Sequence, residues 1–174
     1  VTRGHRFHGT PTITISSADQ YEPILETIGY VIASFEKRKT CIRTALQLEA
    51  SKLPDVIVAE DEALLNEVTG LVEYPAVYPG KFDASFLSVP QECLILSMKQ
   101  HQKYFPLLDQ HGKLLPVFLI VSNLMTDDPR YIINGNERVL RARLSDAQFF
   151  YLQDVKTPLA ERVAQLNHVV YHNQ

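Results

Sequence analysis

The sequence predicts an α+β fold in which helices pack on a mixed sheet. Stretches with helical periodicity alternate along the chain with short runs rich in β-branched residues, as expected for a sheet covered by helices. Residues 114–123, LLPVFLIVSN, are almost continuously apolar, as a central strand is. Residues 104–108 and the polar turn 109–112 precede this run and predict a hairpin. We expect a single compact domain, or a domain fragment, over residues 1–174.

The composition is that of an ordinary globular protein. Hydrophobic residues make up 45% and charged residues 21% of the 174 positions. No apolar run approaches the roughly 20 residues that a membrane span needs, so we expect no membrane partner. The N-terminus has no apolar segment that could serve as a signal peptide. The chain begins without Met, and we expect it to be a piece of a longer protein.

The two cysteines and the net charge narrow the class further. Cys41 and Cys93 each lie in an apolar helical context, where a reduced thiol of a cytoplasmic protein is the default and a disulfide is the less favoured alternative. The net charge of −3 excludes a polycation that binds nucleic acid with its whole surface. Any phosphate contact must therefore come from local patches.

The first nine residues combine basic side chains with two glycines. Arg3, His5, Arg6 and His8 suit a loop that contacts phosphate, and they suit a solvated terminus equally well. His5 and His8 are three residues apart, but no carboxylate or cysteine stands close enough in the sequence to complete a metal site. Residues 12–15 alternate between polar and apolar, which predicts a short half-buried strand.

Two predicted helices follow. Asp19 is a suitable N-cap for the first, with Glu22 three residues on and Pro23 in the first turn. Its buried side would carry Ile24, Leu25, Ile28 and Val31. The second helix spans residues 35–52 and begins with the basic run 37–39, which is more typical of a solvated helix start than of a binding site.

The middle of the chain predicts a strand, two helices and a loop. Residues 56–58 are β-branched and favour a buried strand, and residues 60–68 have an acidic start, Glu60–Glu62, that favours a helix. Residues 73–90 are rich in proline and aromatic residues, which is typical of an ordered loop, with Gly80 as its turn. Pro90 would begin a helix that runs to about residue 100.

The last third contains the longest amphipathic pattern, residues 135–150. A helix that begins at 127–131 is expected to break at 134–136, where Asn136 would cap a new helix running to about residue 154. One face of that helix carries apolar residues at helical spacing, namely Leu140, Leu144, Ala147 and Tyr151, widened by Val139 and Phe150. A final helix would start at Pro158 and bury Leu159, Val163 and Leu166.

The sequence contains no catalytic motif in strong form. A Walker loop, a GxSxG elbow, an HExxH helix and paired CxxC motifs are all missing. The acidic run Glu60–Glu62 resembles helix-start charges more than an acid–base pair. We therefore expect no catalytic residue and no metal ligand in this chain.

Basic residues interleaved with aromatic ones are the more informative signal. They form three clusters, near the N-terminus, at 99–105 and on the helix 135–150. Lysine and arginine contacts to phosphates provide affinity without reading the base sequence. The alternative is that Arg138 pairs with Glu137 or Asp146 and that the clusters only solvate three separate faces. The candidate RNA-contacting residues are Arg3, His5, Arg6, Lys99, His101, Lys103, Arg138, Arg141 and Arg143.

Five stretches, spread in order over almost the whole chain, carry a family resemblance. They are TRGHRFHG at the start, LLNEVTGLVEYP at 64–75, MKQHQKYFPLLDQHGKLLPVFLIVSN at 98–123, GNERVLRARLSDAQFF at 135–150 and PLAERVAQLNHVVY at 158–171. In these stretches the chain resembles the β subunit of the bacterial heterotetrameric glycyl-tRNA synthetases.

The resemblance implies an α2β2 enzyme that joins glycine to tRNA(Gly). The class II catalytic core, which uses ATP and Mg²⁺, lies in the α subunit of that family, so this segment would hold no cofactor itself. The β subunit is long and recognises tRNA, and this chain would be an internal piece of its N-terminal half. It would lie in a region similar to the B3/4 domain of the phenylalanyl enzyme's β subunit. The implied partners are the α subunit, tRNA(Gly) and the remaining β domains, in the cytoplasm.

Residues 135–138, GNER, faintly resemble the ATP-binding third motif of class II synthetases, but residues 132–134 lack the spaced glycines that this motif requires.

Three functions remain. We favour a non-catalytic module that supports subunit architecture, α–β assembly or tRNA docking. The alternatives are an editing-type aminoacyl-tRNA hydrolase and a purely structural interaction domain. Glycine is the smallest amino acid, so a small pocket already excludes larger ones, which weakens the need for editing.

Overall fold

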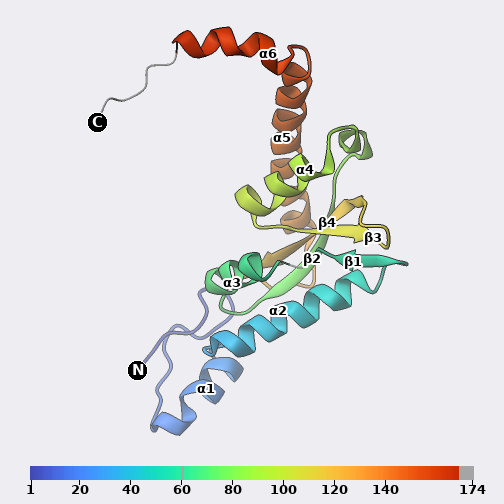
Figure 1. Ribbon diagram of the computed structural model, residues 1–174. Coiled ribbons are helices and arrows are strands. Elements are labelled where there is room, and N and C mark those ends of the chain that lie inside the picture. Colours follow the sequence, from blue (N-terminus) through green and yellow to red (C-terminus); the bar gives the residue numbers. More distant parts are fainter. Residues whose placement is uncertain (60, 169–174) are drawn as a thin grey trace.

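The structure is a computed structural model that describes residues 1–59 and 61–168 (Figure 1). Its helices are α1 (Tyr21–Thr27), α2 (Phe35–Ala50), α3 (Glu62–Leu71), α4 (Gln91–Ser97), α5 (Arg130–Asp154) and α6 (Leu159–Arg162). Its strands are β1 (Val56–Val58), β2 (Ala76–Lys81), β3 (Phe105–Asp109) and β4 (Leu114–Ser122). Short 3-10 helices, η1 (Ala18–Gln20), η2 (Ala84–Ser88) and η4 (Val163–His168), and a π-helical turn, η3 (Met98–Gln102), complete these elements. The predicted acidic position Glu60 and the end of the family-like stretch at 169–171 lie outside the described residues.

The four strands form one sheet in the order β1-β3-β4-β2. This confirms the α+β class and the predicted hairpin of β3 and β4. All three pairings are antiparallel, so the prediction of a mixed sheet is wrong. The strands β1 and β2 follow each other in the chain through α3, but they lie at opposite edges of the sheet and do not pair with each other. Each pairs instead with one strand of the central hairpin, in the antiparallel direction. The prediction of a buried strand at 56–58 is also wrong, because β1 is an edge strand and Ile57 is half exposed.

Two hydrophobic cores lie on opposite faces of this sheet. Successive residues of a strand point to opposite faces, and in β4 Phe118 enters one core while Leu119 enters the other. Helices α2 and α3 cover the Leu119 face, and α4 and α5 cover the Phe118 face. The sheet is therefore the shared middle layer of the molecule.

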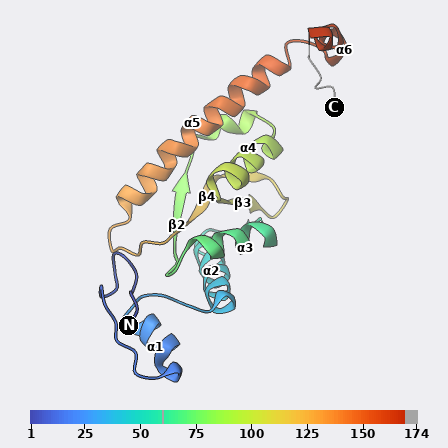
Figure 2. The ribbon, with the colours of Figure 1, turned by 90° about the vertical axis from the view of Figure 1, so that its left-hand side faces the viewer.

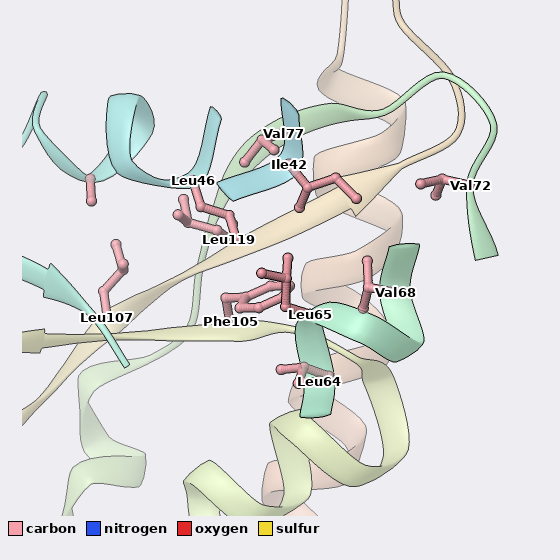
Figure 3. Packing of buried hydrophobic residues seen from close by; sticks show 11 residues of the cluster. Ile42, Leu46, Leu64, Leu65, Val68, Val72, Val77, Phe105, Leu107 and Leu119 are labelled. Atoms are coloured by element: carbon pink, nitrogen blue, oxygen red, sulfur yellow. The ribbon is translucent and has the colours of Figure 1, made fainter. Parts of the chain in front are cut away.

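Figure 3 shows the core under α2 and α3. Ile42 and Leu46 of α2 and Leu65 of α3 pack around Phe105 of β3 and Leu119 of β4. All five side chains are buried. Burial of a side chain of this size contributes roughly 1.5–3 kcal/mol, so these contacts are the main force that holds the two helices on the sheet.

The predicted start of the second helix, at residue 35, agrees with the structure. Helix α2 begins at Phe35, where the Ser34 hydroxyl accepts a hydrogen bond from the Lys37 N–H (3.3 Å). The basic run 37–39 serves the fold, since Arg38 donates to the Thr69 carbonyl (2.9 Å) and Lys39 pairs with Glu62. Within the described part of the chain, no helix combines the length and the hydrophobicity that a bilayer crossing requires.

Residues 73–90 contain β2 and η2, so the prediction of a loop there is wrong in part. Pro79 cannot donate to a strand ladder, but β2 lies at the sheet edge, where this loss is tolerated. Gly80 is not a turn residue. It pairs with Phe118 of β4, and a Cβ at this position would lie 2.6 Å from the Phe118 ring. The glycine therefore makes room for a core side chain.

Helix α5 is continuous over residues 130–154, so the predicted break at 134–136 is wrong. Asn136 is not an N-cap. Its Oδ1 accepts a hydrogen bond from the Tyr104 hydroxyl (2.6 Å), and its Nδ2 donates to the Ile132 carbonyl (2.7 Å). Burial raises the pKa of Tyr104 to about 12. A buried hydroxyl without a hydrogen-bond partner would destabilise the fold by about 1–3 kcal/mol. Asn136, which lies within α5, provides the acceptor that avoids this loss.

Further contacts fix α5 on the sheet. The Glu137 carboxylate accepts a hydrogen bond from the Lys81 N–H at the end of β2 (2.8 Å). Leu140 and Leu144 are fully buried, as their spacing predicts. The prediction that Val139 and Phe150 widen this buried face is wrong, because both are exposed. Val139 lies about 100° round the helix from Leu140, and the C-terminal part of α5 extends past the sheet (Figure 2).

Both ends of the chain depart from the predictions. Residues 12–15 form only a single bridge, between Thr2 and Ile13, instead of a strand. The N-cap of α1 is Gln20 and not Asp19, and α1 buries Leu25 alone of the four predicted side chains. The residues predicted to face inward from the last helix are exposed, because α6 lies beyond the end of the sheet (Figure 1); they are Leu159, Val163 and Leu166.

The continuity of α5 leads to opposite predictions for two neighbouring positions. Gly135→Ala is expected to raise the free energy of unfolding by about 1 kcal/mol, because alanine is the better helix former and its Cβ would meet no described heavy atom within 4 Å. Asn136→Ala is expected to lower it by about 1–3 kcal/mol, because the Tyr104 hydroxyl loses its acceptor. Urea unfolding followed by circular dichroism measures both changes. A loss of stability in Gly135→Ala would contradict a continuous helix.

Candidate nucleic-acid interface

The N-terminal loop, residues 2–13, is held in place by three glycines. The His5 N–H donates to the Gly29 carbonyl (2.6 Å), and the Gly9 N–H donates to the His5 carbonyl (2.9 Å). A Cβ on Gly9 would lie 2.3 Å from the Gly29 oxygen, and one on Gly4 would lie 2.8 Å from the Gly29 Cα. Only glycine allows backbone segments to approach this closely. The loop is therefore packed directly against the end of α1.

His5 lies inside this loop. Its side chain is 1% exposed, and its Nδ1 accepts a hydrogen bond from the Phe7 N–H (3.2 Å). The ring stacks on that of His8 with centroids 4.8 Å apart. Among the described residues no group of histidine, cysteine and carboxylate side chains is suited to hold a metal ion. His5 thus supports the loop from within, whereas Arg3 and Arg6 are exposed.

Arg6 and Phe7 form an exposed pair at this loop. The Arg6 guanidinium lies 5.5 Å from the centroid of the Phe7 ring, which is a cation–π distance. The Phe7 ring is 69% exposed. A solvent-facing ring beside a positive charge is the combination that stacks on unpaired bases. Phe7 is not among the site residues predicted from the sequence, although its place beside Arg6 is the signal that could have identified it.

The second basic cluster is paired with carboxylates of α3. The Lys99 ammonium lies 3.1 Å from the Asp61 carboxylate, and that of Lys103 lies 2.7 Å from the Glu67 carboxylate. These pairs connect η3 to α3. His101, between them, is exposed. Most of the positive charge of this cluster is therefore balanced locally.

Arg138, Arg141 and Arg143 of α5 are exposed, and none of these three forms a salt bridge with another described residue, whereas Arg130 at the start of the helix pairs with Asp128. The alternative in which Arg138 pairs with Glu137 is wrong, because Glu137 binds the Lys81 N–H instead. The pKa of Asp83 is lowered mainly by the hydrogen bond that its carboxylate accepts from the Ser85 N–H. The positive charge of Arg141 lowers this pKa further. Arg143 points about 160° away from Arg141 at ~100° per residue.

The N-terminal loop lies near the start of α5. The His8 Nε2 accepts a hydrogen bond from the Met125 N–H (3.1 Å), shortly before α5 begins, so the loop lies at the foot of that helix (Figure 2). The lysines of η3 pair instead with α3, which covers the other face of the sheet. The structure therefore places the loop that carries Arg3 and Arg6 near the start of α5. Arg138 and Arg141 lie roughly two and three turns further along that helix, and the lysines are not brought to this region.

A hollow of about 790 Å³ lies between α2, β1 and α3. Its floor is apolar, and the polar side chains around it include Arg43, Asp61 and Glu62. The Leu64 N–H, which donates to Asp61 (2.9 Å), lowers the pKa of that carboxyl, and Lys99 adds to the shift.

The second carboxylate at this hollow is engaged in the same way. Hydrogen bonds from Lys39, the larger cause, and from Arg43 lower the pKa of Glu62. The Ser51 hydroxyl at the same hollow is also engaged, because it donates to the Leu48 carbonyl (2.8 Å). Carboxylates that are held ionised and bonded are weak proton acceptors. Both carboxylates at the hollow are therefore engaged in hydrogen bonds and ion pairs that join α3 to neighbouring elements.

Comparison with known proteins gives a consistent family. A family model described as the glycyl-tRNA synthetase β subunit matches residues 1–174. The glycine–tRNA ligase β subunit of Neisseria meningitidis serogroup C / serotype 2a is 60% identical over 173 residues, which are 99% of this chain and 25% of that protein. The same subunit of Nitrosomonas europaea is 52% identical over 174 residues, which are 99% of this chain and 24% of that protein. The chain thus spans about a quarter of the length of the curated relatives it matches.

The capping carboxylate Asp61 leads to a pH-dependent prediction. Its pKa is lower in the folded chain than the ~3.9 of an unfolded one, so its contribution is present above about pH 4 and is lost as the pH falls through the folded value. Asp61→Ala is expected to lower the free energy of unfolding by about 1 kcal/mol at neutral pH, and by much less once the native carboxyl is protonated. Asp61→Asn keeps a capping oxygen and is the matched control, with a smaller loss expected. Urea unfolding over a pH series measures these differences, and a loss that is independent of pH would contradict the assignment.

Proposed function

Because this chain belongs to the family of glycyl-tRNA synthetase β subunits, we propose that it is a non-catalytic module of a glycine–tRNA ligase. The module supports the ATP-dependent glycylation of tRNA(Gly) by building the β subunit and by docking the tRNA backbone. Since the chain spans about a quarter of its relatives, the parts that complete the enzyme lie outside it.

The exposed charge on α5 is the observation that carries the tRNA contact. Arg138 and Arg141 sit three residues apart and form no salt bridge with a described carboxylate, and such a guanidinium is suited to bind phosphate oxygens in bidentate fashion. Arg3 and Arg6 are exposed on the loop near the start of α5 and add positive charge there. Because tRNA contains unpaired bases, the exposed Phe7 ring suits the same partner.

The other predicted residues take part less directly. His5 is buried, and Lys99 and Lys103 are paired with carboxylates, so these three would support the surface without contacting RNA. His101 and Arg143 are exposed but lie away from this surface, and their contact with tRNA stays a prediction.

We assign the family's partners and cofactors to the parent enzyme. The partners are the α subunit, tRNA(Gly) and the remaining β domains, in the cytoplasm, and ATP with Mg²⁺ would bind in the α subunit. Within this chain, Asn136 binds the Tyr104 hydroxyl and Glu137 binds the Lys81 N–H. These bonds support a structural role for GNER in place of ATP binding.

An editing-type hydrolase is the main alternative. Its site would be the hollow beside β1, whose ~790 Å³ could admit an aminoacyl group. Asp61 and Glu62 are both engaged by cations and backbone there, which favours the module. Hydrolysis of mischarged tRNA(Gly) by the intact enzyme, lost on Glu62→Gln, would establish editing instead.

In the intact enzyme, Arg138→Ala combined with Arg141→Ala is expected to weaken tRNA(Gly) binding several-fold. The slope of log K against log salt concentration should fall by about 1 for each arginine removed, because each phosphate contact releases a counterion. Fluorescence anisotropy of labelled tRNA(Gly) over a salt series measures both quantities.

Two variants control for charge and for position. Lys99→Ala with Lys103→Ala removes the same formal charge from paired sites on the other face, and it should leave the slope unchanged. Arg138→Lys with Arg141→Lys keeps the charge and should preserve most of the slope. An unchanged slope in the alanine double variant, with an unchanged circular dichroism spectrum, would leave only the architectural role.

A further inference from the structure

The end of the described chain forms an apolar arm, which we define as residues 149–166. It consists of the last part of α5, with α6 and η4, and it projects beyond the sheet (Figures 1 and 2). Its large apolar side chains are more than half exposed and include Phe149, Phe150, Leu152, Val155, Leu159, Val163 and Leu166. The part of α5 that lies on the sheet differs from the arm, because its large apolar side chains Leu140 and Leu144 are buried.

The α5 part of the arm does not have the pattern of a surface helix. At ~100° per residue, Phe149, Leu152 and Val155 cover about 120° of one side of the helix axis, and Phe150 lies about 100° further round. A helix at the surface of a globular protein has one apolar stripe, whereas a helix that is apolar all round is buried. Phe150 is 64% exposed in this chain alone. This part of the arm therefore exposes an apolar surface that is broader than the single stripe of an ordinary surface helix.

The α6 part adds a single apolar face at a fixed angle. Leu159, Val163 and Leu166 recur at intervals of four and three residues and so share one side. Arg162 connects the two parts of the arm, because its guanidinium lies 3.1 Å from the Asp154 carboxylate and 3.4 Å from the Gln153 carbonyl. The arm is thus a defined corner, not a loose tail.

The size and charge of the arm indicate what it binds. Two phenylalanine side chains alone bury roughly 300–500 Å², and the largest apolar patch on a typical monomer is about 300–600 Å². The aliphatic side chains bring the arm above that range. The charge of Arg162 is taken up by Asp154, and Lys156 is left as a single cation whose ammonium donates to the Gln153 side chain, which is fewer than the several phosphate contacts on which RNA binding depends. Its partner is an apolar protein surface.

We propose that the apolar arm is the surface on which the remaining part of the β-subunit polypeptide packs. The chain spans about a quarter of the relatives' length, so the larger part of that polypeptide lies outside it. A covalently linked segment meets the arm at an effective concentration in the millimolar range, an advantage that a separate subunit does not have. The inference rests on membership in a longer β subunit and is independent of the proposed tRNA contact.

The test is hydroxyl-radical footprinting of the full-length β subunit, purified without α, with oxidation of each phenylalanine read by mass spectrometry. The urea-unfolded subunit gives the reactivity of a fully exposed ring, and Phe118, which is fully buried, gives the lower limit. Phe149 and Phe150 are expected to be oxidised at least about fivefold more slowly than in the unfolded subunit, and close to the rate of Phe118. This protection should persist after tenfold dilution.

Three results would overturn the proposal. Protection that appears only after the α subunit is added would make α the partner. Protection that disappears on dilution would make a second copy of β the partner. Full reactivity under all conditions, including with tRNA(Gly) bound, would mean that the arm is not covered. Because no substitution is needed, a variant that fails to fold cannot confuse the outcome, and the footprint is the same whether or not Arg138 and Arg141 bind tRNA.

Discussion

The placement of every other element depends on the central strand β4. Its successive residues enter two different cores, so that Phe118 holds α4 and α5 while Leu119 holds α2 and α3. A shift of one residue in its register would exchange these two sets of side chains and leave neither core intact. β2 is bound by the same constraint, because Gly80 leaves the space that the Phe118 ring fills. The arginines of α5 are positioned by the same strand, since Leu140 and Leu144 pack in the core that Phe118 enters.

The parts of the fold that the sequence predicts correctly are those with a strong local pattern. The apolar run of β4, the Asp109–Gly112 turn and the periodic face of Leu140 and Leu144 all depend on residues close together in the chain. The predicted break in α5 fails for the opposite reason. Gly135-Asn136 has the composition of a helix start, and only the distant Tyr104 hydroxyl shows that Asn136 belongs inside a helix. The burial predicted for Leu159 and Val163 fails because periodicity identifies an apolar face and cannot identify what covers it.

The candidate site shows the same difference between local sequence patterns, which can be predicted, and contacts between distant residues, which cannot. Sequence identifies the basic residues, but their availability depends on partners from other elements. Lys99 and Lys103 are neutralised by Asp61 and Glu67 of α3, which nothing in the run KQHQK indicates. His5 is buried by the close approach of its backbone to Gly29, a contact between two loops. Arg138 forms no salt bridge with its sequence neighbour Glu137, whose carboxylate binds the end of β2 instead. The family-like stretch 135–150 therefore has one side that packs on the sheet and another side that exposes positive charge.

The hydrogen bond between His8 and Met125 has a consequence for the order of folding. It joins residues that are far apart in the chain, and the entropy lost on closing such a loop is recovered only when both ends are already structured. The hairpin and α5 can form from contacts that are closer in sequence, so the N-terminal loop is expected to dock after them. Segments that join last and bury little apolar surface also open first under native conditions. Amide hydrogens of residues 2–13 should therefore exchange through local opening while those of β4 exchange only when the whole chain unfolds.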